Sequence, residues 1–220
     1  RMAHKQHLLD SQADATQHSA LPLMAALAKD SPVVAVTDCG HWQPMLLLLD
    51  NQQRQGAAGH ISYQLMRSDA GQHVLVELGW RRWDGARSLP VLEAYQGRQC
   101  LHGQLLPAPA IGLRLAQQPT ALPTAHSWLL TALDSAQIAP LAGLAPEQLP
   151  TRVLRPDPAL PLGYARDDVL LPNTLPPEKH LGYAVQWFAL AAAVMILALL
   201  LTWHGRRGGQ GRGGHGRMRQ

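Results

Sequence analysis

The stretch LGYAVQWFALAAAVMILALLLTW, residues 181–203, decides how the rest of the chain is arranged. It contains no Asp, Glu, Lys or Arg, and as one helix it is long enough to cross a hydrocarbon layer about 30 Å thick. The core helix of a water-soluble protein rarely has an uncharged run of this length. The sequence therefore predicts a transmembrane helix here, and every other segment has to suit a chain fixed in a bilayer.

The two flanks of this stretch differ in charge. Five arginines and no acidic residue follow it, whereas Glu178, Lys179 and His180 precede it and nearly cancel. Loops rich in Arg and Lys stay on the cytoplasmic side of a membrane, or on the matrix side in a mitochondrion. We expect residues 204–220 to form an inside tail and residues 1–180 to lie in a periplasm or intermembrane space. The composition, rich in Ala, Gln and Leu, favours a bacterial inner membrane over a mitochondrial one.

The charge balance agrees with this arrangement. The chain has 19 Lys and Arg against 15 Asp and Glu, and five of the 19 are in the tail. The outside part is therefore close to neutral, which gives no support for a nucleic-acid-binding face. Next to a membrane helix, a Gly- and Arg-rich tail is expected to be attracted to anionic lipid headgroups.

The start of the chain raises the question of how an outside domain crossed the membrane. The sequence begins at Arg1 rather than Met, and residues 1–30 contain no apolar segment of a signal peptide. We expect that a further membrane helix preceded Arg1. Residues 1–32 are then expected to be a helical segment that follows it, with a first helix over residues 2–17.

The middle of the chain has the pattern of β structure. Ile61, Tyr63 and Leu65 alternate with polar residues, which is typical of a half-buried strand. The sequence SDAG at 68–71 predicts a hairpin turn, after which HVLVEL at 73–78 predicts the returning strand. The 17 prolines of the chain argue against a helical bundle.

We therefore predict a mainly β outer domain, a small antiparallel sheet or barrel with short helices, over residues 33–155. A Pro-rich linker over residues 156–180 leads into the membrane helix. Within the β domain, Asp50 and Asn51 are interpreted as turn formers that close the apolar run before them. The polar, glycine-containing stretch 52–59 is interpreted as a loop.

Cys39 and Cys100 are the only cysteines. They lack the CxxC spacing of a redox motif or a thiolate metal site. An extracytoplasmic compartment permits a disulfide between them, but spacing in the sequence does not show that their Cα atoms approach closely enough. A disulfide and two free thiols both remain open.

Three segments together resemble the Surfeit-locus-1 (Shy-type) family of cytochrome c oxidase assembly factors. They are LLLLDNQQRQGAAGHISYQLM at 46–66, HVLVELGWRRW at 73–83 and PPEKHLGYAVQWFALAA at 176–192. The third is the most specific, because His180, Tyr183, Trp187 and their neighbours match at fixed spacing. The chain departs from the family pattern at Gln52, where an Arg is usual, and on both sides of the Gly-Trp pair in the second segment.

The resemblance implies a function. It suggests a membrane-anchored assembly factor that assists delivery or insertion of haem a into subunit I of a haem-copper oxidase, with subunit I and haem a synthase as its expected partners. Two alternatives stay open: a scaffold that stabilises oxidase subunits without binding haem, and an envelope enzyme with an unrecognised site. The chain has no GxSxG, HExxH, P-loop or GxGxxG motif, so we expect it not to be an enzyme.

His180 is the candidate haem ligand. It lies at the outer mouth of the predicted helix, where a histidine is commonly only an interfacial residue. A neutral imidazole binds haem iron well, and the resemblance implies haem a handling in bacterial members. Tyr183 and Trp187 either form an aromatic belt at the membrane interface or lie beside a bound porphyrin. His204 is about 36 Å further along a straight helix, so it is not expected to share an iron with His180.

Overall fold

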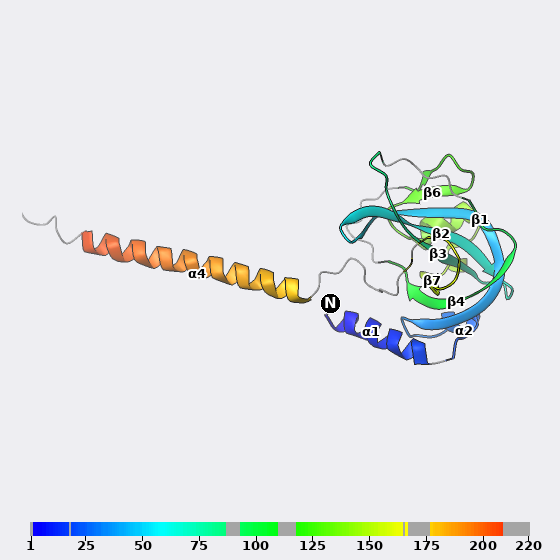
Figure 1. Ribbon diagram of the computed structural model, residues 1–220, viewed down its shortest axis with the longest axis horizontal. Helices are drawn as coiled ribbons and strands as arrows, with labels where there is room; N and C mark the ends of the chain where they lie inside the picture. The colour runs from blue at the N-terminus through cyan, green and yellow to red at the C-terminus, as the bar shows by residue number, and fades with distance from the viewer. Residues whose placement is uncertain are drawn as a thin grey trace, which may run out of the picture. The chain divides into compact units, whose positions relative to one another are not determined.

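The computed structural model describes residues 2–17, 19–86, 93–109, 118–164, 166 and 177–208, and for residues 2–6, 16, 177–181 and 205–208 it describes the backbone alone. The chain divides into two compact units, Arg1–Asn173 and Thr174–Gln220. The first unit contains the β-strands and the shorter helices, and the second contains one long helix (Figure 1). Each unit is described by itself below.

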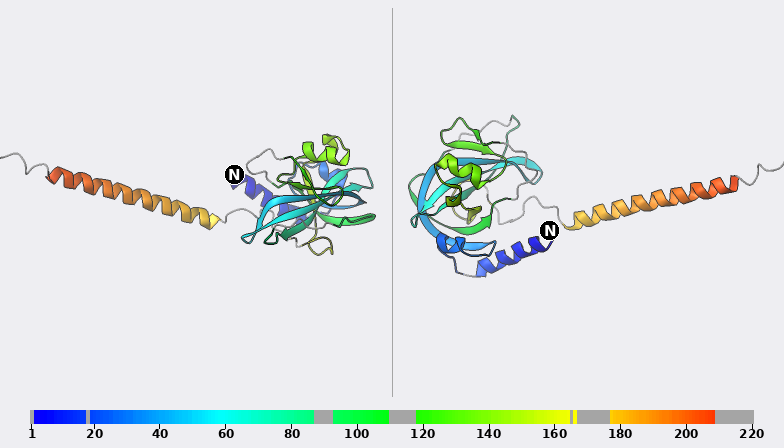
Figure 2. Two further views of the ribbon diagram at one scale, coloured as in Figure 1. Left: turned by 90° about the horizontal axis from the view of Figure 1, so that it is seen from above. Right: turned by 180° about the vertical axis from the view of Figure 1, so that it is seen from behind.

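Strand β1 (Val34–Arg54) is the element around which the first unit is built. At 21 residues it is several times longer than an average strand, and two register shifts, one between Trp42 and Leu46 and one between Leu49 and Gln52, let it bend. Its first half pairs with β4 (Arg98–Pro107), and its second half pairs with β6 (Ser127–Leu130). Strand β1 thus joins β4 and β6 into one sheet (Figure 2).

The strands close into a barrel. Strand β1 pairs with β2 (Ala57–Ser68), β2 with β3 (His73–Arg82), β3 with β7 (Arg152–Pro156), and β7 with β4, which returns to β1. Strands β6 and β5 (Thr120–Ala121) extend the sheet from the second half of β1. The β1–β6 and β3–β7 pairs are parallel. The barrel alternative is therefore confirmed, but the purely antiparallel arrangement is wrong, because long connections allow two parallel pairs.

Both faces of the strands are apolar, so the short elements cover the barrel. Along β1, Leu46 and Leu48 lie in one buried cluster, whereas Met45, Leu47 and Leu49 lie in another. Helix α2 (Leu23–Leu27) contributes to the first of these clusters. The second includes residues from α1 (Met2–Gln17) and α3 (Ser135–Ile138), with the 3₁₀ turns η1 (Ala139–Ala142) and η2 (Pro146–Gln148) beside it. Successive residues of a strand point to opposite faces. Because both faces are buried here, the strand sequences are nearly continuous hydrophobic runs.

Two local expectations have clear outcomes. The hairpin turn at 68–71 forms, with the Gly71 N–H donating to the Ser68 carbonyl and Gly71 at φ 92°. The expected turn at Asp50 and Asn51 is wrong, because both residues lie inside β1 at a register shift where Asn51 has φ 57°. The chain reverses instead at Gln55 and Gly56, both with positive φ, and most of the expected loop at 52–59 is strand.

The second unit is helix α4 (Pro177–Gly208), 32 residues long. Its apolar part, Gly182–His204, has a mean hydropathy of 2.4 and lies within one residue of the predicted span. The described side chains of this part are almost all exposed, as expected for a helix whose natural solvent is lipid. By length and composition the helix is able to cross a membrane.

Candidate functional site

The candidate site on α4 is defined by its backbone. Residue 180 lies inside the helix, three residues after its first residue, and its side chain is outside the described part of the chain. Positions 180, 183 and 187 are separated by three and four residues, so they share one face of an α-helix. The structure thus places His180, Tyr183 and Trp187 along a single stripe at the N-terminal end of the apolar segment.

The two aromatic residues of this stripe are accessible. Tyr183 is 54% exposed and Trp187 is 68% exposed. Ala184 and Ala191 fall on the same face by helical spacing, so small residues border the aromatic rings. A flat, apolar group is therefore able to lie along this face within reach of residue 180. The imidazole of a histidine is a common axial ligand of haem iron, and this donor and these neighbours suit a porphyrin.

His204 belongs to the other end of the helix. Its Nδ1 lies 3.1 Å from the Leu200 carbonyl oxygen, a contact within the helix itself. Because α4 is continuous between residues 180 and 204, a rise of about 1.5 Å per residue separates the two histidines by about 36 Å. The two do not meet at one metal within a single chain.

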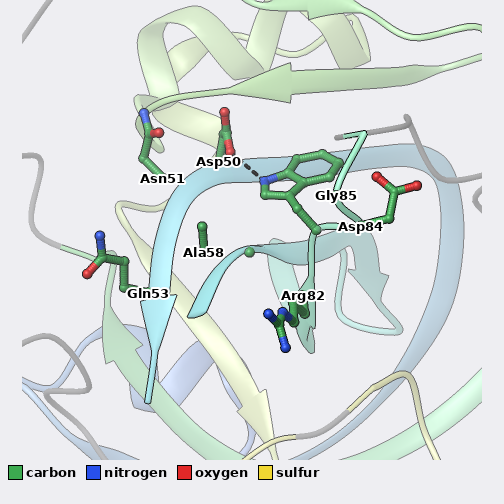
Figure 3. Close-up of a pocket in the computed structure, with 9 residues that line it drawn as sticks. Asp50, Asn51, Gln53, Ala58, Arg82, Asp84 and Gly85 are labelled. Carbon is green, nitrogen blue, oxygen red and sulfur yellow. Dashed lines mark hydrogen bonds between the residues drawn. The ribbon is translucent and has the colours of Figure 1, made fainter. Parts of the chain in front are cut away.

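The barrel carries a pocket of about 640 Å³ that the sequence analysis did not predict. It forms where the register shift in β1 faces the end of β3 (Figure 3). The lining is polar and of mixed charge. The residues are Asp50, Asn51, Gln53, Ala58, Gly59, Arg82, Trp83, Asp84 and Gly85. Carboxylates, amides and a guanidinium around the pocket offer both hydrogen-bond donors and acceptors to a polar group.

Trp83 is the fixed wall of this pocket. Its Nε1 donates to Asp50 Oδ1 at 2.8 Å, the bond drawn as a dashed line in Figure 3. Its ring also packs on His60, with 4.4 Å between the ring centroids. Because both its ring and its N–H are engaged, the indole is held in one orientation.

His60 lies behind Trp83 and is 1% exposed. Neither ring nitrogen has a hydrogen-bond partner. Burial lowers the pKa of His60 to about 4, with a further lowering by the positive charge of Arg81 and an opposing effect of Asp50. The imidazole is thus neutral across the physiological range, because its charged form is poorly solvated in this position.

Two segments of the sequence, rather than any individual residue, indicate where the pocket lies. Seven of its nine lining residues come from two of the three segments that carry the family resemblance, 46–66 and 73–83. Gly79 and Trp80 of the second segment have structural roles. Gly79 has φ 110° beside a register shift between β2 and β3, and Trp80 packs against the core. Pairing of β1, β2 and β3 brings the two segments together, which spacing alone does not reveal.

The described residues hold no group of three or more His, Cys, Asp or Glu able to bind a metal ion. Asp167 and Asp168, an acidic pair in the Pro-rich stretch, lie outside the described residues.

The fold and the helix define a class: a small β-barrel domain joined to an apolar helix of membrane-spanning length. The chain matches the SURF1 family over residues 1–192, and it belongs to that family. The SURF1 family is known for cytochrome oxidase assembly. No curated protein matches the chain. The match includes both the barrel and residues 180, 183 and 187, so the resemblance inferred from three short segments is confirmed.

Proposed function

We propose that this protein assists the delivery or insertion of haem a into subunit I of a haem-copper cytochrome c oxidase. The observation that carries the proposal is the stripe of His180, Tyr183 and Trp187 at one end of a membrane-length helix in a SURF1-family chain. The family supplies the link to oxidase assembly, and the stripe supplies a place for a large apolar cofactor.

In this proposal, His180 provides the axial imidazole, and Tyr183 and Trp187 border the macrocycle. The face of α4 suits this task because both described aromatic side chains are more than half exposed. Haem a is apolar apart from its propionates, so a site in the outer part of the bilayer keeps it out of water while leaving it accessible for transfer. The second axial ligand has to come from outside α4, because the other histidine of this helix is about 36 Å away.

The proposed location follows from the helix and its flanks. We infer a bacterial inner membrane, with the barrel in the periplasm and the basic tail in the cytoplasm. The proposed partners are then oxidase subunit I, haem a synthase and membrane lipid, with no nucleic acid. In this orientation, these partners are able to meet the barrel on the outer side of the membrane and a haem on the outer half of α4.

The test is an optical spectrum of the full chain purified in detergent from cells that make haem a. The unchanged protein is expected to carry a haem a absorption band, and His180→Ala is expected to lose most of it. His204→Ala is the matched control, since it removes a histidine from the opposite end of the same helix, and it should retain the band. Tyr183→Leu and Trp187→Leu should shift or weaken the band without abolishing it.

Two other results would contradict the proposal in different ways. If His180→Ala and His204→Ala lose the band equally, the stripe is not the ligand site. If no protein carries a band although the cells contain haem a, the scaffold alternative is favoured, in which the protein stabilises oxidase subunits without binding haem. The amount of subunit I in cells that lack the protein then becomes the decisive measurement.

A further inference from the structure

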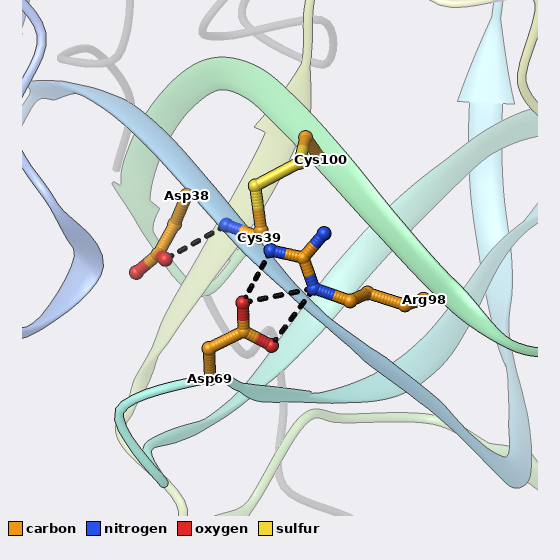
Figure 4. Close-up of a disulfide and its surroundings, with 5 residues drawn as sticks. All are labelled: Asp38, Cys39, Asp69, Arg98 and Cys100. Carbon is orange, nitrogen blue, oxygen red and sulfur yellow. Dashed lines mark hydrogen bonds and ion pairs between the residues drawn. A yellow bond between two sulfur atoms is a disulfide. The ribbon is translucent and has the colours of Figure 1, made fainter.

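The disulfide between Cys39 and Cys100 joins the first half of β1 to β4. The two residues are directly opposite in the antiparallel register. The backbone of Cys39 is turned away from β4, since its N–H donates to Asp38 Oδ1 and its carbonyl accepts from the Asp69 N–H. The pair is therefore of the non-hydrogen-bonded kind, in which side chains of neighbouring strands come closest (Figure 4).

This disulfide is on the outer surface of the strand pair. Cys100 is exposed and Cys39 is half-buried, and neither belongs to a buried apolar cluster. Their neighbours on the same face are also accessible. These are Thr37 and His41 on β1, opposite His102 and Arg98 on β4. A thiol in solution is thus able to reach the sulfur of Cys100 without opening the core.

The strands have other connections that hold them together. Their ladder runs over eight residue pairs, from Val34 with Leu105 to His41 with Arg98. Trp42 Nε1 donates to Gln99 Oε1 at 2.9 Å across the same two strands. Arg98 also forms an ion pair with Asp69 at 2.6 Å, which ties β4 to the β2–β3 turn. Cleavage of the sulfur–sulfur bond therefore leaves the native arrangement of β1 and β4 supported.

The electrostatic surroundings favour thiolates. His41, Arg98 and His102 flank the two sulfurs on one face, with the Arg98–Asp69 pair beside the bond in Figure 4. The acidic groups near them are Asp38, Asp69 and Asp157. Asp38 accepts from the Cys39 and Leu23 N–H groups, Asp69 binds Arg98, and Asp157 Oδ2 is 3.8 Å from His102 Nε2. Positive charge next to a sulfur stabilises the thiolate, which is both the attacking and the leaving group in thiol–disulfide exchange.

We propose that Cys39 and Cys100 form a reversible thiol–disulfide exchange site that is reduced by a dithiol protein. The partner's thiolate attacks Cys100 Sγ and forms a mixed disulfide, while the bond to Cys39 breaks and Cys39 leaves as a thiolate. The partner's second thiolate then attacks the partner's own sulfur of the mixed disulfide and releases Cys100. The partner dithiol is oxidised to a disulfide by two electrons, and Cys39 and Cys100 become two thiols after proton uptake. Haem binding has no part in this exchange.

The competing interpretation is a permanent staple. A cross-link over a sequence separation of 61 residues restricts the unfolded chain and thereby stabilises the fold. A staple and an exchange site differ in where reduction takes place. A staple that is protected by the fold reacts only when the protein unfolds, whereas an exchange site reacts in the folded protein.

The first experiment measures reduction of the full chain in detergent by dithiothreitol, followed by alkylation of the released thiols and mass determination. The folded protein is expected to react within about tenfold of the rate in guanidinium chloride, because Cys100 is exposed. The circular dichroism of the reduced protein should keep its β signal. Reduction that is about a thousandfold slower in the folded protein, or that removes the β signal, overturns the proposal.

A matched pair of variants separates electrostatic control from loosening of the strands. Arg98→Gln removes the cation beside the sulfurs and should slow native-state reduction about three- to tenfold. Asp69→Asn leaves Arg98 unneutralised and should speed it by a similar factor. Both changes remove the same ion pair, so a staple that is merely loosened would react faster in both variants, and that result contradicts the proposal.

The partner chemistry is probed with a thioredoxin whose resolving cysteine is replaced by serine, which traps the mixed disulfide. One adduct per chain is expected, attached to Cys100, as read from the masses of its peptides. Attachment mainly to Cys39, or no adduct while dithiothreitol reacts in the folded protein, overturns the assignment of a protein dithiol attacking Cys100.

Discussion

The buried residue His60 makes the stability of the barrel depend on pH. Its ring is packed on Trp83, both nitrogens lack partners, and its pKa is about 4 in the folded protein. The ordinary pKa is 6.5, so between pH 6.5 and 4 the unfolded chain binds a proton that the folded chain does not. By linkage, this residue causes the free energy of unfolding to fall as the pH drops through that window.

We expect His60→Phe to abolish this part of the pH dependence. Phenylalanine keeps a ring against Trp83 but has no group to protonate. Relative to this variant, the unchanged protein should lose roughly 3 kcal/mol of stability between pH 6.5 and 4. Urea unfolding of the full chain in detergent, followed by tryptophan fluorescence at several pH values, measures the difference.

Thr37→Val is the control for this prediction, because Thr37 is exposed on the barrel surface. The change removes no titratable group, so it should leave the pH dependence that of the unchanged protein. Parallel curves for the unchanged protein and His60→Phe would contradict burial as the cause of the lowered pKa. At neutral pH, His60→Phe should be at least as stable as the unchanged protein, since it removes two buried polar atoms without partners.

At the scale of the elements, the pairing of the short strand β7 requires its backbone to lie very close to that of β4. The β4–β7 ladder completes the barrel, and Gly103 lies opposite Pro156 in it. A Cβ at Gly103 would meet the Arg155 carbonyl oxygen, with the Pro156 Cα 2.7 Å away. These are backbone atoms, so they have no rotamer by which to move aside. A residue without a side chain is therefore required where the two strands meet.

Gly103→Ala is accordingly expected to destabilise the barrel by about 1–3 kcal/mol, the usual cost of forcing extra atoms into a packed site. Thermal unfolding monitored by circular dichroism provides the measurement. Gly85→Ala is the matched control, because a Cβ at Gly85 meets nothing within 4 Å, and it should change stability by less than about 0.5 kcal/mol. Equal effects of the two substitutions would show that β7 tolerates a wider separation from β4.

The first residue of β7 also supports the strand. The Arg152 guanidinium donates to five backbone carbonyls, those of Ala26, Lys29, Ser31, Pro32 and Leu105. One of these belongs to α2 and three belong to the segment that leads from α2 to β1. Burial lowers the pKa of Arg152, yet an arginine keeps its proton at any physiological pH. A planar group with five N–H donors is thus able to join β7, β4 and the N-terminal segment at one point.

At the scale of the whole molecule, the positive charge of the segment after α4 predicts the orientation of the chain in the membrane. Arginines follow the apolar segment without an acidic residue among them, so residues 204–220 should remain in the cytoplasm. Alkaline phosphatase fused after residue 220 is expected to be inactive in a bacterial host, and a green fluorescent protein fused there is expected to fluoresce. The reporters respond to opposite sides of the membrane.

A second pair of fusions checks the cause of this orientation. Replacing the five arginines of the tail by glutamine should weaken the preference and raise the phosphatase activity severalfold, because the positive charge is what retains the tail. High phosphatase activity in the unchanged chain would place the barrel in the cytoplasm. That result would contradict the proposed location and, with it, access of the disulfide to an extracytoplasmic dithiol protein.

Some features of this protein followed from the sequence by itself. The long apolar helix was predicted to within one residue of the apolar segment of α4, because an uncharged run of this length is a local signal for a helix able to span a membrane. The hairpin at 68–71 was predicted because turn residues and alternating strands are local signals. The SURF1 family was inferred from three short segments, whose residue types and spacing are also local signals.

Other features were decided only by the tertiary structure. Asp50 and Asn51 have the composition of a turn, yet pairing with β2 holds them inside a strand. The pocket around Trp83, the burial of His60 and the closure of the barrel through β7 all join residues that are far apart in the chain. The pairing of Cys39 with Cys100 was open for the same reason. Local sequence determines which residues favour a strand, but strand register, which sets the partners, depends on burying both faces of the sheet at once.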